Sequence, residues 1–163
     1  MSVQAKTQVS LIGDLNGGAA PGALYFPEAA SQSFLIDSLV YLSNGSVVAC
    51  ASSATLIYGI AKKAATGSTG SILPVIPLIP TSLLSMNVYH STSASAVTAL
   101  TDSGKKYSIN LDSSKKFYYV DISATSPASV VVQIIDPTTA AGDQYGKYQV
   151  TIQSSILQTV VGV

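Results

Sequence analysis

Few side chains in this sequence of 163 residues are able to do chemistry. It holds a single His, His90, a single Cys, Cys50, and no Arg or Trp, and only 10% of its residues are charged. An active site brings several titratable groups together and shifts their pKa values. The composition therefore favours a protein that is not an enzyme and that uses no cofactor.

The two most reactive side chains lack the neighbours that catalysis needs. His90 could be combined with Asp102 in a Ser–His–Asp triad, but no Gly-x-Ser-x-Gly nucleophile elbow accompanies them. Cys50 stands in an apolar stretch with no second Cys, as expected of a buried structural thiol. We therefore predict no catalytic residue.

The acidic residues do not form a convincing metal or glycosidase motif. Asp14 begins a stretch that hints at a calcium loop, but the glycine and glutamate of an EF-hand are missing. Asp136 and Asp143 bracket a loop and could share a cation, although Asp-Pro and Gly-Asp pairs are ordinary in turns. A glycosidase would need two acids in a cleft, and the only Glu, Glu28, lies in an irregular segment. We predict no bound metal.

The charge balance argues against nucleic acid and membranes as partners. The formal net charge is +0, so no field steers the protein toward an anionic surface. The Lys pairs 62–63, 105–106 and 115–116 fit solvated turns, and without Arg there is no bidentate contact to phosphate. A net charge near zero also removes a common protection against self-association, so we expect a homo-oligomer.

Neither a targeting signal nor a membrane span is evident. Residues 1–10 lack the apolar region of a signal peptide, so we expect synthesis in the cytoplasm. The most apolar stretch, residues 72–79, is interrupted by prolines and is too short to span a bilayer. Pro74, Pro77 and Pro80 recur every third residue. This fits either a polyproline docking segment or a proline-guarded edge or loop of a β-domain, and we favour the second.

From residue 34 onward, the sequence predicts an all-β body that extends to residue 163. Apolar and polar residues alternate with a period of two, which is typical of antiparallel strands with one exposed face. Asn44-Gly45 predicts a tight hairpin turn, and the only weak helix candidate is residues 61–66. The expected architecture is an antiparallel β-barrel or a jelly-roll-like sandwich. The predicted strands lie within residues 34–42, 47–50, 56–61, 84–88, 107–111, 118–122, 130–134 and 148–152.

Residues 1–33 are rich in Gly, Ala and Pro and show no sustained period, which predicts an extended N-terminal arm. Its low charge argues against a solvated tail, so it should dock on a surface. The expected anchors are Leu11, Leu24, Tyr25 and Phe26. We expect them to contact other chains, either sister subunits or a shell. The alternative is an arm that packs on its own body.

The segments follow one another in a distinctive order. After the apolar arm come residues 39–50 (LVYLSNGSVVAC), 57–61 (IYGIA), 86–90 (MNVYH), 106–109 (KYSI) and 142–152 (GDQYGKYQVTI). This order resembles the small structural proteins of tailed-bacteriophage heads, the capsid decoration or cement proteins. The likeness covers most of residues 34–158 and rests on a pattern of strands and turns.

This resemblance implies a β-rich body that sits on a capsid, bridges neighbouring capsid subunits and has the major capsid protein as its partner. The protein would be made in the host cytoplasm and located on the virion surface, with no catalytic residues. The alternative is a carbohydrate- or receptor-binding β-domain of a phage fibre or adhesin. That alternative predicts an exposed aromatic cluster, whereas the sequence has no Trp and its Tyr residues are scattered through strands.

Overall fold

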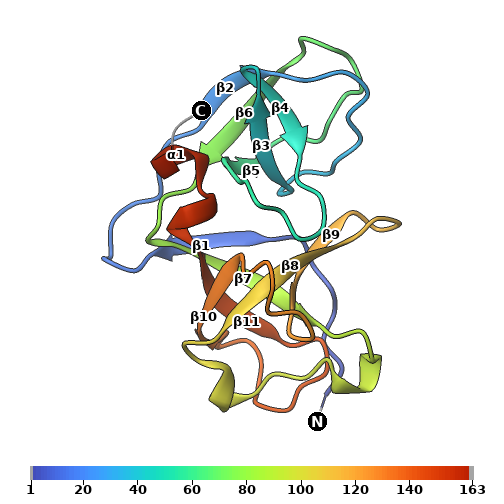
Figure 1. Cartoon of the computed structure of the whole chain (residues 1–163), viewed down its shortest axis with the longest axis vertical. Coiled ribbons are helices and arrows are strands. Elements are labelled where there is room, and N and C mark those ends of the chain that lie inside the picture. The colour runs from blue at the N-terminus through green and yellow to red at the C-terminus, as the bar shows by residue number, and fades with distance from the viewer. Residues whose placement is uncertain (1, 162–163) are drawn as a thin grey trace.

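The computed structural model describes residues 2–161 and shows an all-β protein, as the sequence predicts. Two sheets lie one above the other along the longest axis of the molecule (Figure 1). Within residues 2–161, helical structure is limited to short turns, of which the longest is α1 (Gln158–Val161), with 4 residues. The other turns are η1 (Ser93–Ser95), η2 (Leu100–Asp102) and η3 (Ser154–Ile156).

The lower sheet closes into a five-stranded barrel. Its strand order is β1-β7-β11-β10-β8-β9, and an additional pairing of β7 with β9 closes the ring, leaving β1 outside it. The β7–β9 pairing is parallel and the other pairings of this sheet are antiparallel, so the barrel is mixed. The strands are β1 (Ser10–Asp14), β7 (Ser82–Tyr89), β8 (Lys106–Asp112), β9 (Phe117–Asp121), β10 (Val130–Ile135) and β11 (Lys147–Ile152).

Strand β7 serves two partners along one edge. Its first half pairs with β1, where Ser10 lies opposite Ser85, and its second half pairs with β9, where Asn87 lies opposite Tyr119. Strand β11 occupies the other edge. Because the ring is closed, the barrel strands leave few unpaired edge groups that could pair with another chain.

The upper sheet has five antiparallel strands in the order β2-β6-β5-β3-β4. A bridge between Glu28 and Val47 brings the end of β2 against β4, so this sheet also curls round on itself. Strands β5 and β6 approach closely at Gly59, where a Cβ would lie 2.2 Å from the carbonyl oxygen of Ile76. The strands are β2 (Leu24–Pro27), β3 (Leu39–Ser43), β4 (Ser46–Ala49), β5 (Gly59–Ala61) and β6 (Ile72–Pro77).

The predicted hairpin turn at Asn44-Gly45 is confirmed. It joins β3 to β4, and both residues have positive φ, 48° for Asn44 and 77° for Gly45. Positive φ at both central residues is the requirement of a type I′ turn, which Asn-Gly meets at low cost. The sequence therefore specified this connection locally.

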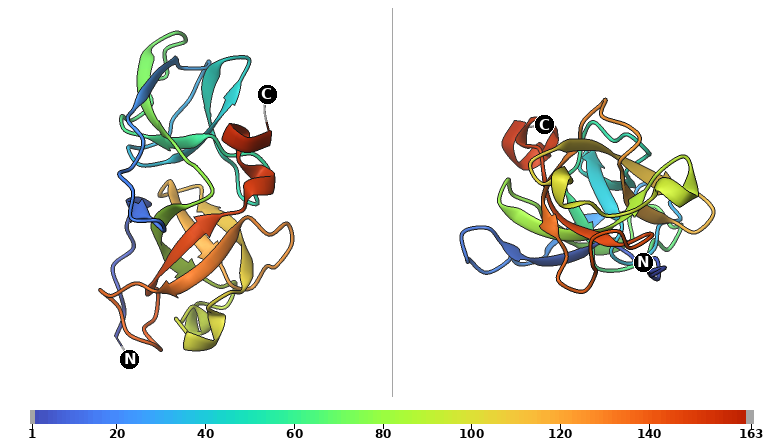
Figure 2. Two further views of the ribbon diagram at one scale, coloured as in Figure 1. Left: turned by 90° about the vertical axis from the view of Figure 1, so that its left-hand side faces the viewer. Right: turned by 90° about the horizontal axis from the view of Figure 1, so that it is seen from below.

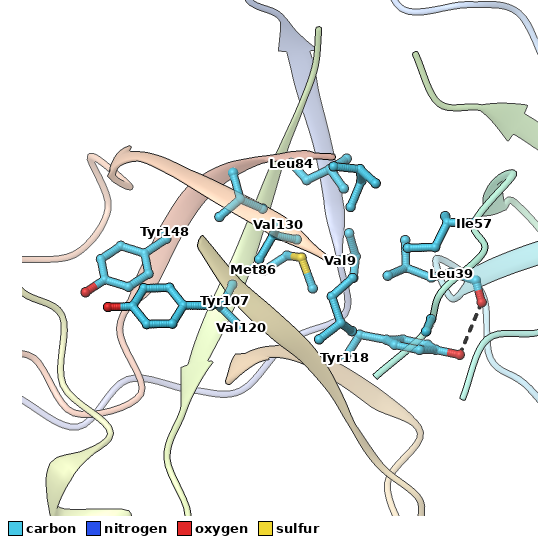
Figure 3. Packing of buried hydrophobic residues seen from close by; sticks show 14 of the residues in the cluster. Val9, Leu39, Ile57, Leu84, Met86, Tyr107, Tyr118, Val120, Val130 and Tyr148 are labelled. Carbon is cyan, nitrogen blue, oxygen red and sulfur yellow. Dashed lines mark hydrogen bonds between the residues drawn. The ribbon is translucent and has the colours of Figure 1, made fainter. Parts of the chain in front are cut away.

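The main core fills the barrel and extends up to the lower face of the upper sheet (Figure 3). Tyr118 of β9 joins the two parts, because its hydroxyl lies 2.7 Å from the carbonyl oxygen of Cys50 and 3.1 Å from that of Leu39. A second, smaller cluster lies inside the curled upper sheet. Its buried members are Phe34, Val40, Leu42, Val47, Ala61, Leu73 and Val75.

The N-terminal arm lies along its own body rather than projecting from it (Figure 2). Within it, β1 pairs with β7 of the barrel sheet and β2 pairs with β6 of the upper sheet. Val9 is 2% exposed and belongs to the main core. The boundary expected at residue 34 therefore matches no division in the structure, because the arm supplies a strand to each sheet.

Three local expectations need correction. Residues 34–38 precede β3 instead of belonging to it, and residues 61–66 form no helix. The prolines guard no edge: Pro74 and Pro77 lie within β6, which pairs with β2 on one side and β5 on the other. Proline lacks only the backbone N–H, and its carbonyl oxygen still bonds: that of Pro74 accepts the N–H of Lys62 at 2.8 Å.

Candidate functional site

One buried carboxylate, Asp102, lies in the turn η2 at the lower end of the barrel. Its Oδ1 accepts hydrogen bonds from Tyr107 Oη and Lys105 Nζ, both at 2.9 Å, and its Oδ2 accepts the hydroxyl of Tyr148. Burial alone would raise the pKa of Asp102, but the hydrogen bonds from Tyr148, Lys105 and Tyr107 outweigh it and lower the pKa below 3.8. The carboxylate therefore stays ionised and fastens the turn η2 to β8 and β11.

Asp136 and Asp143 have separate partners and hold different segments. Asp143 accepts the backbone N–H of Ser2 and the side-chain amide of Gln4, both at 2.9 Å, and so ties down the start of the chain. Asp136 accepts the hydroxyl of Ser85 at 2.6 Å. Among residues 2–161, no three His, Cys, Asp or Glu side chains lie close enough together to hold a metal ion.

Glu28 closes a loop of the upper sheet. Its side chain is buried, and it accepts the backbone N–H of Thr66 at 2.9 Å, the hydroxyl of Thr66 at 2.7 Å and the backbone N–H of Gly67 at 2.7 Å. Burial works against the charged form, but these bonds lower the pKa of Glu28 below 4.5. The role that this geometry supports is to hold the loop that leads into β6.

Among residues 2–161, the side chains of His90 and Cys50 form hydrogen bonds only with backbone groups, not with a second titratable side chain. His90 follows β7 directly, and its Nδ1 accepts the backbone N–H of Thr92 at 2.9 Å. Asp102 bonds to tyrosines and a lysine instead of to His90. Cys50 is 1% exposed, and burial raises the pKa of its thiol, which disfavours the reactive thiolate.

The four expected anchors of the N-terminal arm divide into two pairs. Leu11 packs against the main core and Phe26 against the upper cluster, so both serve their own chain. Leu24 is 48% exposed and Tyr25 is 70% exposed. Tyr25 lies opposite Pro74 on β6, which places its side chain on the outer face of the upper sheet.

The barrel covers only part of this outer face, and the part that it leaves uncovered is apolar. On the same side of the sheet, Leu39 and Ile60 pack into the main core. Farther from the barrel, Tyr25 and Ile72 are 70% and 57% exposed. We call this part of the sheet, formed by the exposed Tyr25 and Ile72 and the half-buried Pro27 and Pro74, the β2–β6 face. Exposed large apolar side chains that lie together are typical of an interaction site.

A second candidate site is a depression of about 280 Å³ on the side of the barrel, which we call the tyrosine pocket. The rings of Tyr89 and Tyr119 stack there with centroids 5.8 Å apart and an interplanar angle of 20°. Lys6 Nζ lies 5.5 Å from the centroid of Tyr119 and 4.1 Å from that of Tyr145. The polar and aromatic side chains that line the pocket are Lys6, Tyr89, Asn110, Asp112, Ser113 and Tyr119.

The electrostatics of the tyrosine pocket are set by Asp112. Its carboxylate accepts the hydroxyl of Ser114 at 2.6 Å and the backbone N–H of Lys115 at 3.1 Å, and these bonds lower its pKa below 3.8. Burial and the charge of Asp112 raise the pKa of Tyr119 to about 12. At neutral pH Asp112 is therefore a carboxylate, and the phenol of Tyr119 keeps its proton.

Sequence reasoning missed this cluster because its members are far apart in the chain. Lys6 comes from the N-terminal arm, Tyr89 from β7, Tyr119 from β9 and Tyr145 from the loop before β11. In the sequence the tyrosines are merely scattered through strands, whereas in the structure Tyr119 is buried beneath Tyr89. Tyr89 stacks on Tyr119 because β7 pairs with β9, and no spacing of residues along the sequence indicates that pairing.

No protein-family model, curated protein or solved structure matches this chain. Across residues 2–161, the helices are all too short to cross a membrane.

Proposed function

We propose that this chain is a structural virion protein that decorates and cements a bacteriophage capsid by bridging neighbouring capsid subunits. The observation that carries the proposal is the β2–β6 face. There, Tyr25 and Ile72 are 70% and 57% exposed on two paired strands of the upper sheet. Burying large apolar and aromatic side chains is the usual source of binding energy at protein interfaces. The resemblance to capsid decoration proteins names the partner, the major capsid protein.

The rest of the molecule suits a load-bearing role. The N-terminal arm runs along both sheets and pairs with each, so it ties them together over the length of the protein. The buried carboxylates Asp102, Asp136 and Glu28 each hold a turn or loop, and this use of the acidic groups supports a role that is not enzymatic. We further propose that the protein acts as a homo-oligomer on the capsid surface.

The proposal is tested on virions of the phage that carries this gene. Quantitative mass spectrometry of purified virions should find the protein in a fixed ratio to the major capsid protein. Emptied heads stripped of the protein should rebind it. The double variant Tyr25→Asp/Ile72→Asp should rebind at least about tenfold more weakly, because it places charges in the interface.

A matched control comes from the opposite end of the protein. Leu100 is 71% exposed, like Tyr25, but lies in the turn η2 below the barrel. Leu100→Asp should rebind like the parent. Absence of the protein from virions, or rebinding of the double variant at parental affinity, would overturn the proposal.

The alternative is a carbohydrate- or receptor-binding domain of a fibre or adhesin. The feature that supports it is the tyrosine pocket, which the half-buried Tyr89 lines together with Lys6. The two functions differ in copy number and place. A fibre domain would occur in few copies at the tail, whereas a decoration protein would occur in many copies over the head.

A further inference from the structure

The tyrosine pocket has features that the structural role does not explain. It collects side chains from the N-terminal arm, β7, β8 with the turn that follows it, and β9. A depression where a few polar groups converge beside aromatic rings is the usual form of a small-molecule site. The β2–β6 face, by contrast, is flat and apolar and belongs to the upper sheet.

The aromatic wall of the pocket is the half-buried ring of Tyr89, which the buried ring of Tyr119 supports from behind. The two rings stack at 5.8 Å, and Tyr119 is held by β7 and β8 on either side of β9. An aromatic ring offers an apolar face and, in tyrosine, a polar rim. A pyranose ring is built in the same way, with C–H groups on its faces and hydroxyls around its edge. The accessible part of Tyr89 therefore suits a flat, amphipathic ring.

The polar part of the pocket has unused bonding capacity. Asp112 Oδ1 accepts the bonds from the turn, whereas the contact of Asp112 Oδ2 with Tyr119 Oη is long, at 3.5 Å. Lys6 forms no ion pair with the residues described, and its ammonium group rests against tyrosine rings. An available carboxylate oxygen and an available ammonium group are an acceptor and a donor for hydroxyl groups.

The charges select among ligand classes. The pocket is lined by one acidic and one basic side chain, Asp112 and Lys6, so its charges largely cancel and it favours a neutral ligand over an ion. The volume of about 280 Å³ lies just below the range of ~300–1,000 Å³ typical of ligand pockets, which limits the occupant to about one sugar ring.

We propose that the tyrosine pocket binds one ring of a neutral saccharide, with the ring lying against Tyr89 and its hydroxyls bonded to Asp112 and Lys6. This inference goes beyond the structural role and does not depend on it. A protein that decorates a capsid would gain a contact to cell-surface or environmental glycans, and the site would remain if the capsid role were disproved.

The test is a titration of the full chain with methyl glycosides of glucose, mannose and galactose at millimolar concentrations. Binding is monitored by ¹H–¹⁵N NMR. At least one glycoside should give saturable shifts centred on Asn110, Asp112 and Ser113. Tyr89→Ala and Lys6→Gln should each weaken binding by about tenfold or remove it, because each removes a contact to the ring or its hydroxyls. Tyr25→Ala, which changes a tyrosine outside the pocket, should bind like the parent.

Thermal unfolding of each variant distinguishes lost contacts from lost fold. Lys6→Gln keeps most of the stem of the side chain, so it remains informative if Tyr89→Ala unfolds. The proposal is overturned if none of the three glycosides gives saturable shifts, or if folded Lys6→Gln binds as well as the parent. Tighter binding of inorganic phosphate than of every glycoside would also overturn it, because the pocket would then be an anion site.

Discussion

Whether the N-terminal arm packs on its own chain can be tested by shortening one of its side chains, in the variant Val9→Ala. Val9 is 2% exposed and lies in the main core, as Figure 3 shows. The substitution removes two methyl-sized groups, worth about 0.8 kcal/mol each, or roughly 1.6 kcal/mol together. Incomplete closure of the resulting cavity adds to this loss, so we expect the free energy of unfolding to fall by about 2–3 kcal/mol.

The same arm contains a matched control. Val3→Ala removes the same groups from a side chain that is 70% exposed, so its effect should stay within about 0.5 kcal/mol. Urea unfolding followed by far-UV circular dichroism and tyrosine fluorescence measures both variants. Val9→Ala should also lower Tm by about 5–10 °C, from the ~2–4 °C per kcal/mol typical of this size.

Protein concentration separates packing on the same chain from packing on a neighbour. If Val9 packs in the core of its own chain, the difference in free energy of unfolding between Val9→Ala and the parent should be the same in dilute and concentrated samples. Equal stabilities of Val9→Ala and Val3→Ala would refute the reasoning. A loss that appears only in concentrated samples would assign Val9 to an intersubunit contact.

Two further predictions concern buried hydroxyl and carboxylate groups. Tyr118→Phe removes the donor shared by the carbonyl oxygens of Leu39 and Cys50 and should cost about 1–3 kcal/mol in urea unfolding; an unchanged midpoint would show that this link between the sheets contributes nothing. Because the pKa of Asp102 is lowered below 3.8 in the folded protein, its contribution to stability is present above that pH and is lost as the pH falls through the lowered value. Stability measured in urea should therefore fall between about pH 5 and pH 2, and Asp102→Asn, which keeps an acceptor for Tyr148, should fall less steeply; parallel curves would contradict this.

The strands of the barrel could be predicted because their signal is local. Leu84, Met86 and Val88 alternate with polar residues, and the structure buries all three. In a strand, successive side chains point to opposite faces, so a buried face appears in the sequence as a period of two. The Asn44-Gly45 turn was predictable for a similar reason, because its requirement for positive φ falls on two adjacent residues.

The same alternation gave a wrong prediction for the polar face of β7, because the N-terminal arm covers that face. Ser85 and Asn87 were expected on an exposed side of β7, yet they are 6% and 0% exposed. Asn87 accepts the backbone N–H of Thr7 at 2.8 Å and donates to the carbonyl oxygen of Tyr145 at 2.6 Å. A polar residue that bonds to a distant segment cannot be told from a solvated one by its neighbours in sequence.

The sequence also could not reveal strands β1, β2 and β6. They are rich in Gly and Pro or lack a period, and their pairing is decided by partners far along the chain, such as Ser10 with Ser85 and Leu24 with Val75. The tyrosine pocket was hidden for the same reason, since it depends on the parallel pairing of β7 with β9.

By itself, then, the sequence determined the all-β class, most barrel strands and one hairpin, together with the scarcity of catalytic groups. These are local properties, governed by backbone preferences and by which face of each strand is apolar. Only the tertiary structure decided that the arm belongs to both sheets, that Leu11 and Phe26 face inward while Tyr25 faces outward, and that Lys6 meets the tyrosine rings. Those outcomes depend on pairing between distant segments, where main-chain hydrogen bonds are available to almost any residue and carry little sequence information.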